Sequence, residues 1–324
     1  SNDYLGLSQH PAVVAAAHAA LDRWGAGSGA ARLIVGSRPV HAAVERELAD
    51  WKGTEAAVLF PTGFAANLGV LATLGKGTII LSDELNHASI IDGARMARAE
   101  IKVYRHADAA HVDELLAAHG GPAIVVSDSV FSMDGDVAPV EKLVEACRGR
   151  GALLVLDEAH AVLGPDVDDP DVVHVGTLSK TLGSLGGFAA GPQAIVDLLV
   201  NRARSYIFTT ASTPADMAAA SAALAIVRSA EGDALRARLR RSIDRLVPGH
   251  PSPILPIVIG DEGDTVAAAA ALFEGGLLVP AIRPPTVAPG SSRLRLALSA
   301  AHTDEQLDAL VAGLDACVPS WRDG

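Results

Sequence analysis

The chain has 324 residues, 49% of them hydrophobic and 20% charged, which is enough for a sizeable core and suggests about two domains. Its formal net charge of -12 excludes a general nucleic-acid or anionic-membrane surface and leaves room only for local basic patches. The two cysteines, Cys147 and Cys317, lack metal-like spacing, and no apolar run reaches the roughly 18–20 residues of a membrane span, so we expect a cytoplasmic protein with reduced thiols.

The first predicted elements are two helices, Pro11–Trp24 and Val40–Trp51, and the second has its apolar residues on one face. Short apolar runs then alternate with helical patterns as far as Ala190. The strand candidates are Ala56–Phe60, Thr78–Ser82, Ile101–Tyr104, Ala123–Ser127, Leu153–Asp157, Val172–Val175 and Phe188–Ala190. The helix candidates between them are Ala88–Ala99, Ala110–His119 and Val140–Arg150. This alternation predicts an α/β fold with a mostly parallel seven-stranded sheet and helices on both faces.

The pattern changes after Pro214, where an Ala- and Arg-rich helical region runs to Leu246. The predicted elements that follow are Ile254–Ile259, a helix at Thr265–Phe273, Leu277–Arg283, Arg293–Ser299 and a last helix from Asp304. They indicate a smaller α+β C-terminal domain. We therefore expect an N-terminal segment, 1–40, that packs with the small domain, a large domain, 41–213, and a small domain, 214–324.

One glycine-rich segment, Gly25–Ala30, fits the dinucleotide fingerprint G-x-G-x-x-G/A. That fingerprint works only between a strand and the start of a helix. Here a helix precedes the segment and no clear helix follows it, so we reject a nicotinamide site.

The chemistry-bearing segments are Gly176–Lys180 and Leu153–His160. The first gives a lysine with hydroxyls nearby directly after an apolar run, and the second gives Asp157 at the end of a buried strand. Pyridoxal phosphate (PLP) chemistry needs this set: an amine for a Schiff base, a carboxylate for the pyridine nitrogen, and donors for the phosphate and ring oxygen. The plain alternative is a surface lysine and a turn-capping aspartate, but their occurrence together favours a cofactor site.

Polar residues also follow the other strand candidates. They are Asp83, Asn86 and His87, then Asp128, Ser129 and Ser132, in addition to Asp157, His160, Thr177, Ser179 and Lys180. Ligands of open α/β sheets bind at the carboxyl ends of the strands, so one ligand could touch all of these sets. The turn Thr62–Asn67 opens a helix, and its glycine lets backbone N–H groups approach a phosphate.

Four motifs carry a family resemblance: Asn86–Ser89, Val130–Asp136, Asp157–His160 and Thr177–Lys180. With them, the chain resembles the α-oxoamine synthases, PLP enzymes of the aspartate-aminotransferase fold (fold type I) that condense an amino acid with an acyl-CoA. Matching segments run from Asn2 to His302, nearly the whole chain. The resemblance implies a homodimer with the active site at its interface, and no metal, nucleic-acid or membrane partner.

The resemblance implies the following catalytic roles. Lys180 would hold PLP as a covalent aldimine and act as the base on the substrate Cα. Asp157 would pair with the pyridinium nitrogen, and His160 would hydrogen-bond the ring hydroxyl. His87 would stack on the ring, the alternative being a helix N-terminal histidine that faces solvent.

The remaining cofactor contacts implied by the resemblance are Gly63, Phe64, Ser132, Thr177, Thr209 and Thr210. Gly63 and Phe64 would offer backbone donors and Thr177 a hydroxyl to the phosphate, while Ser132 would lie near the ring oxygen. Thr209 and Thr210 would reach the phosphate of the neighbouring subunit. For these two the alternative is a turn before the long helix, with Ser212 or Thr213 as its N-cap.

Arg283 would clamp the substrate carboxylate and Thr286 would line the substrate site, together with His87. The segment Ile282–Val287 looks most like family members that join L-alanine to a pimeloyl thioester, carried by CoA or a carrier protein, in biotin biosynthesis. The alternatives are a glycine-using relative (2-amino-3-ketobutyrate CoA ligase or 5-aminolevulinate synthase type) and a non-catalytic PLP-binding partner subunit. Shortened loops after His160 and between Ile243 and Pro253 motivate the last of these.

Overall fold

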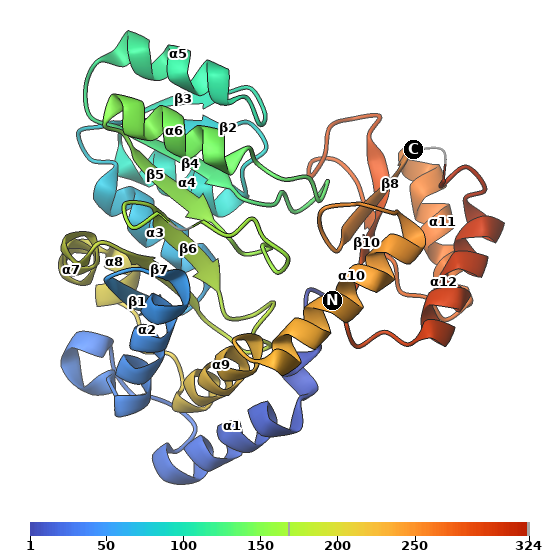
Figure 1. Cartoon of the computed structure of the whole chain (residues 1–324), viewed down its shortest axis with the longest axis horizontal. Coiled ribbons are helices and arrows are strands. Elements are labelled where there is room, and N and C mark those ends of the chain that lie inside the picture. Colours follow the sequence, from blue (N-terminus) through green and yellow to red (C-terminus); the bar gives the residue numbers. More distant parts are fainter. Residues whose placement is uncertain (168, 323–324) are drawn as a thin grey trace.

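The computed structural model of the chain describes residues 1–167 and 169–322 (Figure 1). It has a large α/β unit and a smaller α+β unit, and helix α10 (Ala230–Leu246) runs from the first to the second (Figure 1). The predicted end of the small domain, residues 323–324, lies outside the described residues. Of the helices in the described part of the chain, none combines the length and apolar character that crossing a membrane requires.

The large unit is built on a sheet that, within the described residues, has seven strands in the order β1-β7-β6-β5-β4-β2-β3. The strands are β1 (Ala56–Phe60), β2 (Ile79–Asp83), β3 (Glu100–Tyr104), β4 (Ala123–Asp128), β5 (Leu153–Asp157), β6 (Val173–Thr177) and β7 (Gly187–Gly191). Strand β7 is antiparallel to both of its neighbours, and β2 to β6 are parallel. The predicted fold class is confirmed, and each predicted strand agrees with an observed one within one or two residues.

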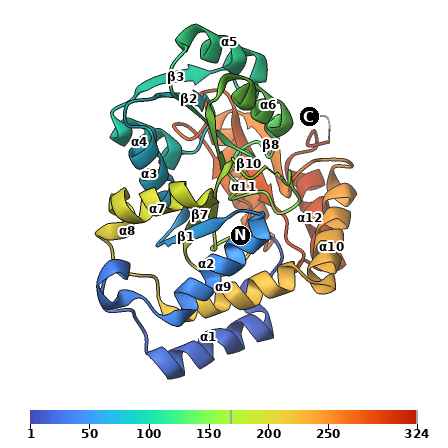
Figure 2. The same ribbon diagram turned by 60° about the vertical axis from the view of Figure 1, so that its left-hand side comes forward.

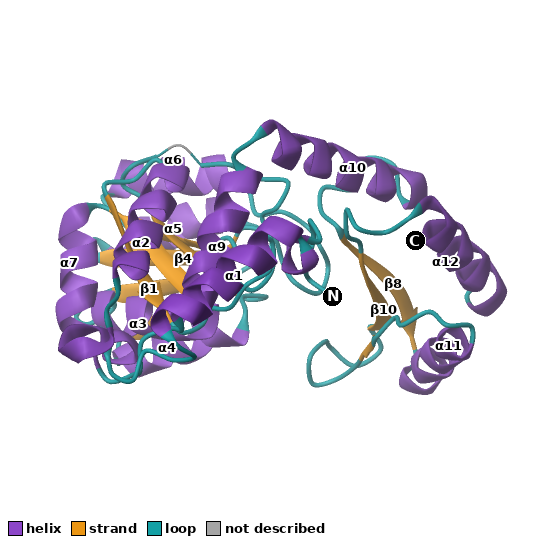
Figure 3. Ribbon diagram, turned by 90° about the horizontal axis from the view of Figure 1, so that it is seen from below, coloured by secondary structure: helices purple, strands orange, loops and turns teal. Residues whose placement is uncertain are grey.

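Helices cover both faces of this sheet (Figure 3). One face carries α2 (Pro39–Lys52), α5 (Ala109–His119) and α6 (Val140–Arg150), and the other carries α3 (Gly63–Leu74), α4 (Ala88–Ala97), α7 (Gln193–Arg202) and α8 (Arg204–Ile207). Alternate strand residues enter opposite cores, as the two-residue period of a strand requires: Val125 faces α5 and α6, while Ile124 and Val126 face α3 and α4. The sequence analysis missed α7 and α8, because short helices leave little periodic signal.

The small unit has an antiparallel sheet in the order β8-β10-β9. Its elements are β8 (Ile254–Gly260), α11 (Glu262–Glu274), β9 (Ala281–Ile282), β10 (Ser292–Ala297) and α12 (Asp304–Cys317). Only two residues of the predicted strand Leu277–Arg283 pair, because Pro280 has no N–H group to donate to the ladder. The predicted long helix is two helices, α9 (Pro214–Val227) and α10, and Ser229 caps the second.

The N-terminal segment contains η1 (Leu7–Gln9), α1 (Pro11–Trp24) and η2 (Arg32–Gly36). Helix α1 packs along α9 (Figure 2). Before it, the carbonyl oxygen of Tyr4 accepts a 2.8 Å hydrogen bond from the N–H of Ala300, near the end of β10. The segment thus contacts the C-terminal part of the chain, and the division at residues 40 and 213 stays a prediction. Gly25–Ala30 lies in the loop between α1 and η2, with no strand before it.

One glycine fixes the packing of β7 against the start of α3. A Cβ atom added to Gly187 would overlap the carbonyl oxygen of Thr62, the residue that caps α3. We therefore predict that Gly187→Ala lowers the free energy of unfolding by about 1–3 kcal/mol, the usual cost of overpacking. Denaturant unfolding followed by circular dichroism measures this change.

The control is Gly149→Ala in α6, where an added Cβ meets nothing within 4 Å. This substitution should stabilise the protein by about 0.4–1 kcal/mol, because it restricts the unfolded chain. Equal effects of the two substitutions would contradict a steric role for Gly187.

Candidate active site

A cavity of about 210 Å³ lies at the carboxyl ends of the central strands. It brings together seven of the predicted site residues: Gly63, Phe64, His87, Asp157, His160, Thr177 and Lys180. Thr62, Ser89, Asp128, Ala159 and Ser179 also line it. The polar residues that follow the strands thus lie together, as expected for parallel strands that end at one edge of a sheet. The role of each residue stays a prediction.

The carboxylate of Asp157 is held in place at the end of β5. Its Oδ2 accepts a 2.6 Å hydrogen bond from Nδ2 of Asn67, and its Oδ1 accepts one of 2.9 Å from the N–H of Ala159. The same Asn67 amide group donates to Oγ of Ser89. Asn67 and Ser89 were not among the predicted site residues. A polar side chain inside the apolar helix α3 was the available signal for Asn67, which is buried.

A chain of short contacts joins Lys180 to Tyr4 through His160. Nζ of Lys180 lies 2.7 Å from Nε2 of His160, and the Tyr4 hydroxyl lies 2.6 Å from Nδ1 of the same ring. Burial lowers the pKa of Lys180 and holds that of His160 well below its usual range, where the cationic Lys180 also lowers it. Burial raises the pKa of Tyr4 to about 12, although Arg295 opposes this.

The Tyr4 hydroxyl has a second partner, because it also donates to Oδ1 of Asn2 at 3.2 Å. The tautomer of His160 sets which of its two ring nitrogens donates in the contacts to Tyr4 and Lys180. The sequence analysis quoted the segment that contains Tyr4 but gave the residue no role, because nothing local links it to His160.

His87 caps helix α4 and lines the cavity at the same time. Its backbone N–H donates to Oδ2 of Asp128 at 2.7 Å, and its Nδ1 accepts from the N–H of Ser89 at 3.2 Å. Burial lowers the pKa of His87. Burial raises the pKa of Asp128 well above its usual range, and the negative charge of Asp157 adds to the effect. His87 is an exposed N-cap residue that also borders the cavity, so its stacking role stays a prediction beside the alternative of a solvent-facing histidine.

The start of α3 forms a cradle for an anion. Thr62 caps the helix by accepting from the N–H of Ala65, and among the described residues the N–H groups of Gly63 and Phe64 have no acceptor. A Cβ on Gly63 would lie 3.2 Å from Cβ of Thr177, so a side chain there would crowd the cradle. The hydroxyl of Thr177 donates to the carbonyl oxygen of Gly186 at 3.0 Å. Free N–H groups at a helix N-terminus suit a phosphate.

Five predicted residues are not among those that line the cavity: Ser132, Thr209, Thr210, Arg283 and Thr286. The carbonyl oxygen of Ser132 accepts a 2.5 Å hydrogen bond from Nε of Arg295. Thr210 forms a bridge with Ala31, and Thr213 is the N-cap of α9, as the alternative for this segment proposed. Arg283 and Thr286 are exposed in the loop after β9.

Comparison with known proteins places this site in a family. The family model for aminotransferase class I and II matches residues 1–314. The chain belongs to the aminotransferase class I and II family. Family members similar to it include the 8-amino-7-oxononanoate synthases of Anaeromyxobacter dehalogenans and Burkholderia thailandensis. The first is 50% identical over 98% of this chain and 85% of the relative, and the second is 48% identical over 97% and 86%.

Solved structures of the aminotransferase class I and II fold agree. A serine palmitoyltransferase from S. paucimobilis with bound PLP and myriocin matches with a TM-score of 0.92 at 30% identity, covering 100% of this chain and 87% of that one. An 8-amino-7-oxononanoate synthase from Francisella tularensis matches with a TM-score of 0.82 at 27% identity, covering 98% and 96%. The predicted family and fold are confirmed.

The pKa of Lys180 should depend on the charge of Asp157. Burial lowers this pKa, and the carboxylates of Asp157 and Asp128 act against it by stabilising the ammonium form. We predict that Asp157→Asn, in the protein freed of bound ligand, lowers the pKa of Lys180 further, because it removes a negative charge and keeps the shape. The measurement is the pH dependence of labelling of Lys180 by an amine reagent, read by mass spectrometry of its peptide.

Asp113→Asn is the matched control, because Asp113 pairs with Arg150 on the surface, away from the cavity. It should leave the labelling profile of Lys180 unchanged. A profile that moves to higher pH in Asp157→Asn would contradict the charge coupling.

Proposed function

We propose that the chain is a PLP-dependent acyltransferase that joins L-alanine to a pimeloyl thioester. The products would be 8-amino-7-oxononanoate, CO2 and a free thiol, the reaction of biotin biosynthesis. The proposal is carried by one observation: Lys180, Asp157, His160 and His87 meet in one cavity of a chain that is 50% identical to an 8-amino-7-oxononanoate synthase over 98% of its length.

The residues around the cavity fit PLP. The N–H groups of Gly63 and Phe64 would bind the phosphate, and Thr177 would add a hydroxyl. The carboxylate of Asp157 would bind the ring nitrogen, and His160 would bind the ring oxygen. When bound, PLP supplies an electron sink for a carbanion at the substrate Cα.

The protein's own contribution is to place protons. The lowered pKa of Lys180 favours its neutral amine, which is the form that acts as a nucleophile and as a base. Lys180 would therefore take the Cα proton of alanine and return it at the end of the reaction. Asn67 and the N–H of Ala159 hold the Asp157 carboxylate in one orientation. The carboxylate would therefore stay next to the ring nitrogen throughout the reaction.

The alanine carboxylate would be bound by Arg283. A guanidinium matches a carboxylate with two hydrogen bonds, and within the described residues the Arg283 side chain makes no hydrogen bond or ion pair that would compete. Because Arg283 and Thr286 belong to the small domain, 214–324, we propose that this domain closes on the large domain, 41–213, to complete the site. The acyl thioester, of CoA or of a carrier protein, would enter from the opposite side.

We propose that the enzyme is a homodimer. Three consecutive apolar side chains of η2 are exposed, Leu33 by 50%, Ile34 by 74% and Val35 by 69%, and Phe208 after α8 is exposed by 70%. Helix α8 contacts η2, and a bridge between Ala31 and Thr210 ties the two segments together. Apolar side chains gathered in this way are typical of a protein interface. Thr209 and Thr210 of one subunit would then contact the phosphate site of the other.

Two alternatives are distinguished by experiment. A glycine-using relative would have the same cavity, since the residues there bind the cofactor and not the substrate side chain. A non-catalytic partner subunit fits less well, because it would not need the buried contact between Lys180 and His160. The identity to 8-amino-7-oxononanoate synthases favours alanine.

The deciding experiment is an assay of thiol release from pimeloyl-CoA with alanine, glycine or serine. We expect turnover with alanine, and loss of turnover in Lys180→Ala, because that change removes both the nucleophile and the base. Turnover with glycine and none with alanine would establish the glycine-using alternative. No turnover with any amino acid or acyl donor, in protein that binds PLP, would support the non-catalytic alternative.

Arg283→Lys tests the carboxylate clamp. Lysine keeps the positive charge but loses the two-pronged geometry, so alanine affinity should weaken by roughly 1–3 kcal/mol, the range for a charge-assisted hydrogen bond. Titration of alanine into the PLP-loaded enzyme, followed by absorbance, gives the affinity. The affinity for the acyl thioester should change much less, and equal weakening of both would indicate a folding defect.

A further inference from the structure

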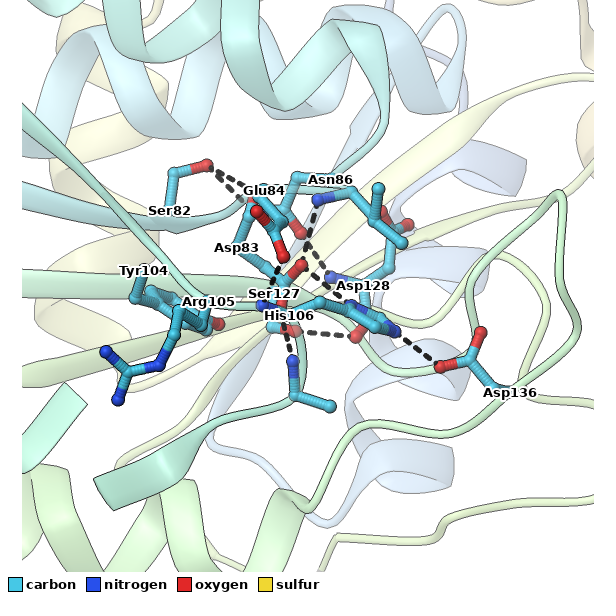
Figure 4. A network of polar contacts seen from close by, with 12 residues as sticks. Ser82, Asp83, Glu84, Asn86, Tyr104, Arg105, His106, Ser127, Asp128 and Asp136 are labelled. Carbon is cyan, nitrogen blue, oxygen red and sulfur yellow. Dashed lines mark hydrogen bonds and ion pairs between the residues drawn. The ribbon is translucent and has the colours of Figure 1, made fainter. Parts of the chain in front are cut away.

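His106, at the end of β3, lies between two carboxylates (Figure 4). Its Nδ1 is 3.0 Å from Oδ1 of Asp83, and its Nε2 is 2.7 Å from Oδ2 of Asp136. A carboxylate accepts hydrogen bonds and a neutral imidazole has only one N–H group, so both contacts are satisfied only when both ring nitrogens carry hydrogen. The geometry is that of an imidazolium clamped by two anions.

Asp83 is the fixed side of this clamp. It is buried at the end of β2, and its carboxylate also accepts from the N–H of Leu85 at 2.9 Å and from that of Ala107 at 2.8 Å. The backbone N–H of His106 donates to Glu84 at 2.9 Å, which ties β3 to the same strand end. These contacts fix the position of the Asp83 carboxylate, which would stay in place if the His106 ring moved.

The carboxylate of Asp136, the second anion of the clamp, depends on His106 for its hydrogen bond. Its Oδ1 is buried and has no hydrogen-bond partner among the described residues, so His106 provides the carboxylate's hydrogen bond. Asp136 belongs to the hairpin of residues 129–138, which Val130 and Val137 close as a bridge pair. Phe131 of the hairpin also packs edge-on against the His106 ring, with centroids 4.4 Å apart. If His106 lost its positive charge, the partly buried carboxylate of Asp136 would lose its ion-pair partner.

The other side of the hairpin contacts the small domain. Asp134 pairs with Arg293, and the carbonyl oxygen of Ser132 accepts from Arg295, both from β10. Gly135 approaches the backbone of Ile254 so closely that a side chain would not fit between them. The hairpin is thus held by His106 on one side and by the sheet of the small domain on the other.

We propose that the imidazolium of His106 is a positioning residue that fixes the hairpin 129–138, and through it the small domain, relative to the active-site cavity. This proposal rests on the proposed function, because its kinetic consequence depends on the proposed role of Arg283 in the small domain. His106 itself is not a catalytic residue, since it does not line the cavity.

The charges around His106 decide the direction of its pH dependence. Burial lowers the pKa of His106, but the hydrogen bonds that His106 donates to Asp83 and Asp136, together with their charges, outweigh burial and the pKa is raised. The other charged groups nearby are Glu84, which directly follows β2, Asp128 at the end of β4, which Asn86 contacts, and Arg105, which pairs with Asp108. A raised pKa in the folded state means that the stabilisation is present at low pH and is lost as pH rises through that pKa.

The first experiment measures His106 and the hairpin directly in the PLP-loaded enzyme. A histidine-labelled NMR titration gives the pKa of His106, and hydrogen exchange read by mass spectrometry follows residues 129–138. We expect the His106 pKa to exceed about 6.5, the value of an unperturbed histidine, and to fall in Asp136→Asn. Exchange of the hairpin should accelerate roughly tenfold in Asp136→Asn, the size of one lost charge-assisted hydrogen bond. Asp113→Asn, the surface control, should change neither value.

The second experiment separates KM from kcat. In Asp136→Asn, KM for alanine should rise roughly tenfold with a much smaller change in kcat, because the clamp positions the carboxylate site and not the reacting atoms. His106→Gln should give the same increase and abolish its pH dependence, since glutamine is not charged. A wild-type KM that rises through the NMR-measured pKa of His106 is the expected signature.

The proposal is overturned if His106 titrates at or below about 6.5, the value of an unperturbed histidine, or if hairpin exchange is the same in Asp136→Asn and wild type. These readouts need no turnover. If the wild type fails to use alanine, the proposed function fails, while the NMR and exchange results still decide the role of His106.

Discussion

The site depends on two carboxylates buried side by side at neighbouring strand ends. Asp128 and Asp157 are register partners on β4 and β5, and both are nearly inaccessible to water. Two buried like charges in contact with little else would be costly. Hydrogen bonds offset part of this cost, because Asp128 accepts from the N–H of His87 and Asp157 accepts from the amide of Asn67. Burial, together with the neighbouring carboxylate, also raises the pKa of Asp128.

The large sheet and the location of the site were predictable from sequence for the same reason. Parallel strands buried on both faces read as continuous apolar runs, and the polar residues that end them, such as Asp157 and Lys180, meet at one edge. The contacts of Tyr4 with His160 and of His106 with its two carboxylates were not predictable, and Asn67 left only the signal of a polar residue in an apolar helix. Each depends on residues far apart in the chain, 156 positions for Tyr4 and His160, and no local period records such a contact.

The fold that this chain shares with other enzymes does not by itself determine the substrate. Serine palmitoyltransferases and an 8-amino-7-oxononanoate synthase share this fold with TM-scores from 0.82 to 0.93, although their names specify different substrates. The residues that line the cavity fit the PLP chemistry that enzymes of this fold can share. Arg283 and Thr286, the residues proposed to bind the substrate, lie outside the cavity in an exposed loop, where the fold leaves room for substitution.

The reversed direction of β7 has a consequence for how such differences arise. Because β7 is antiparallel to β6, the connection between them, residues 178–186, turns back directly instead of crossing over through a helix. Lys180 therefore lies on a short loop whose two ends are both anchored in the sheet, with Thr177 paired to Gly187. Gly63, Phe64 and His87 lie at strand-to-helix turns, whereas Asp157 and His160 begin the connection from β5 to β6, in which the described residues form no helix. The loop of Lys180 contacts α9 through Ser184, whose hydroxyl donates to the carbonyl oxygen of Asp216. The reactive amine and the carboxylate of Asp157 are therefore both attached to sheet strands by loops, so a change in the length or packing of α3 or α4 would shift the phosphate cradle before it shifted either of them.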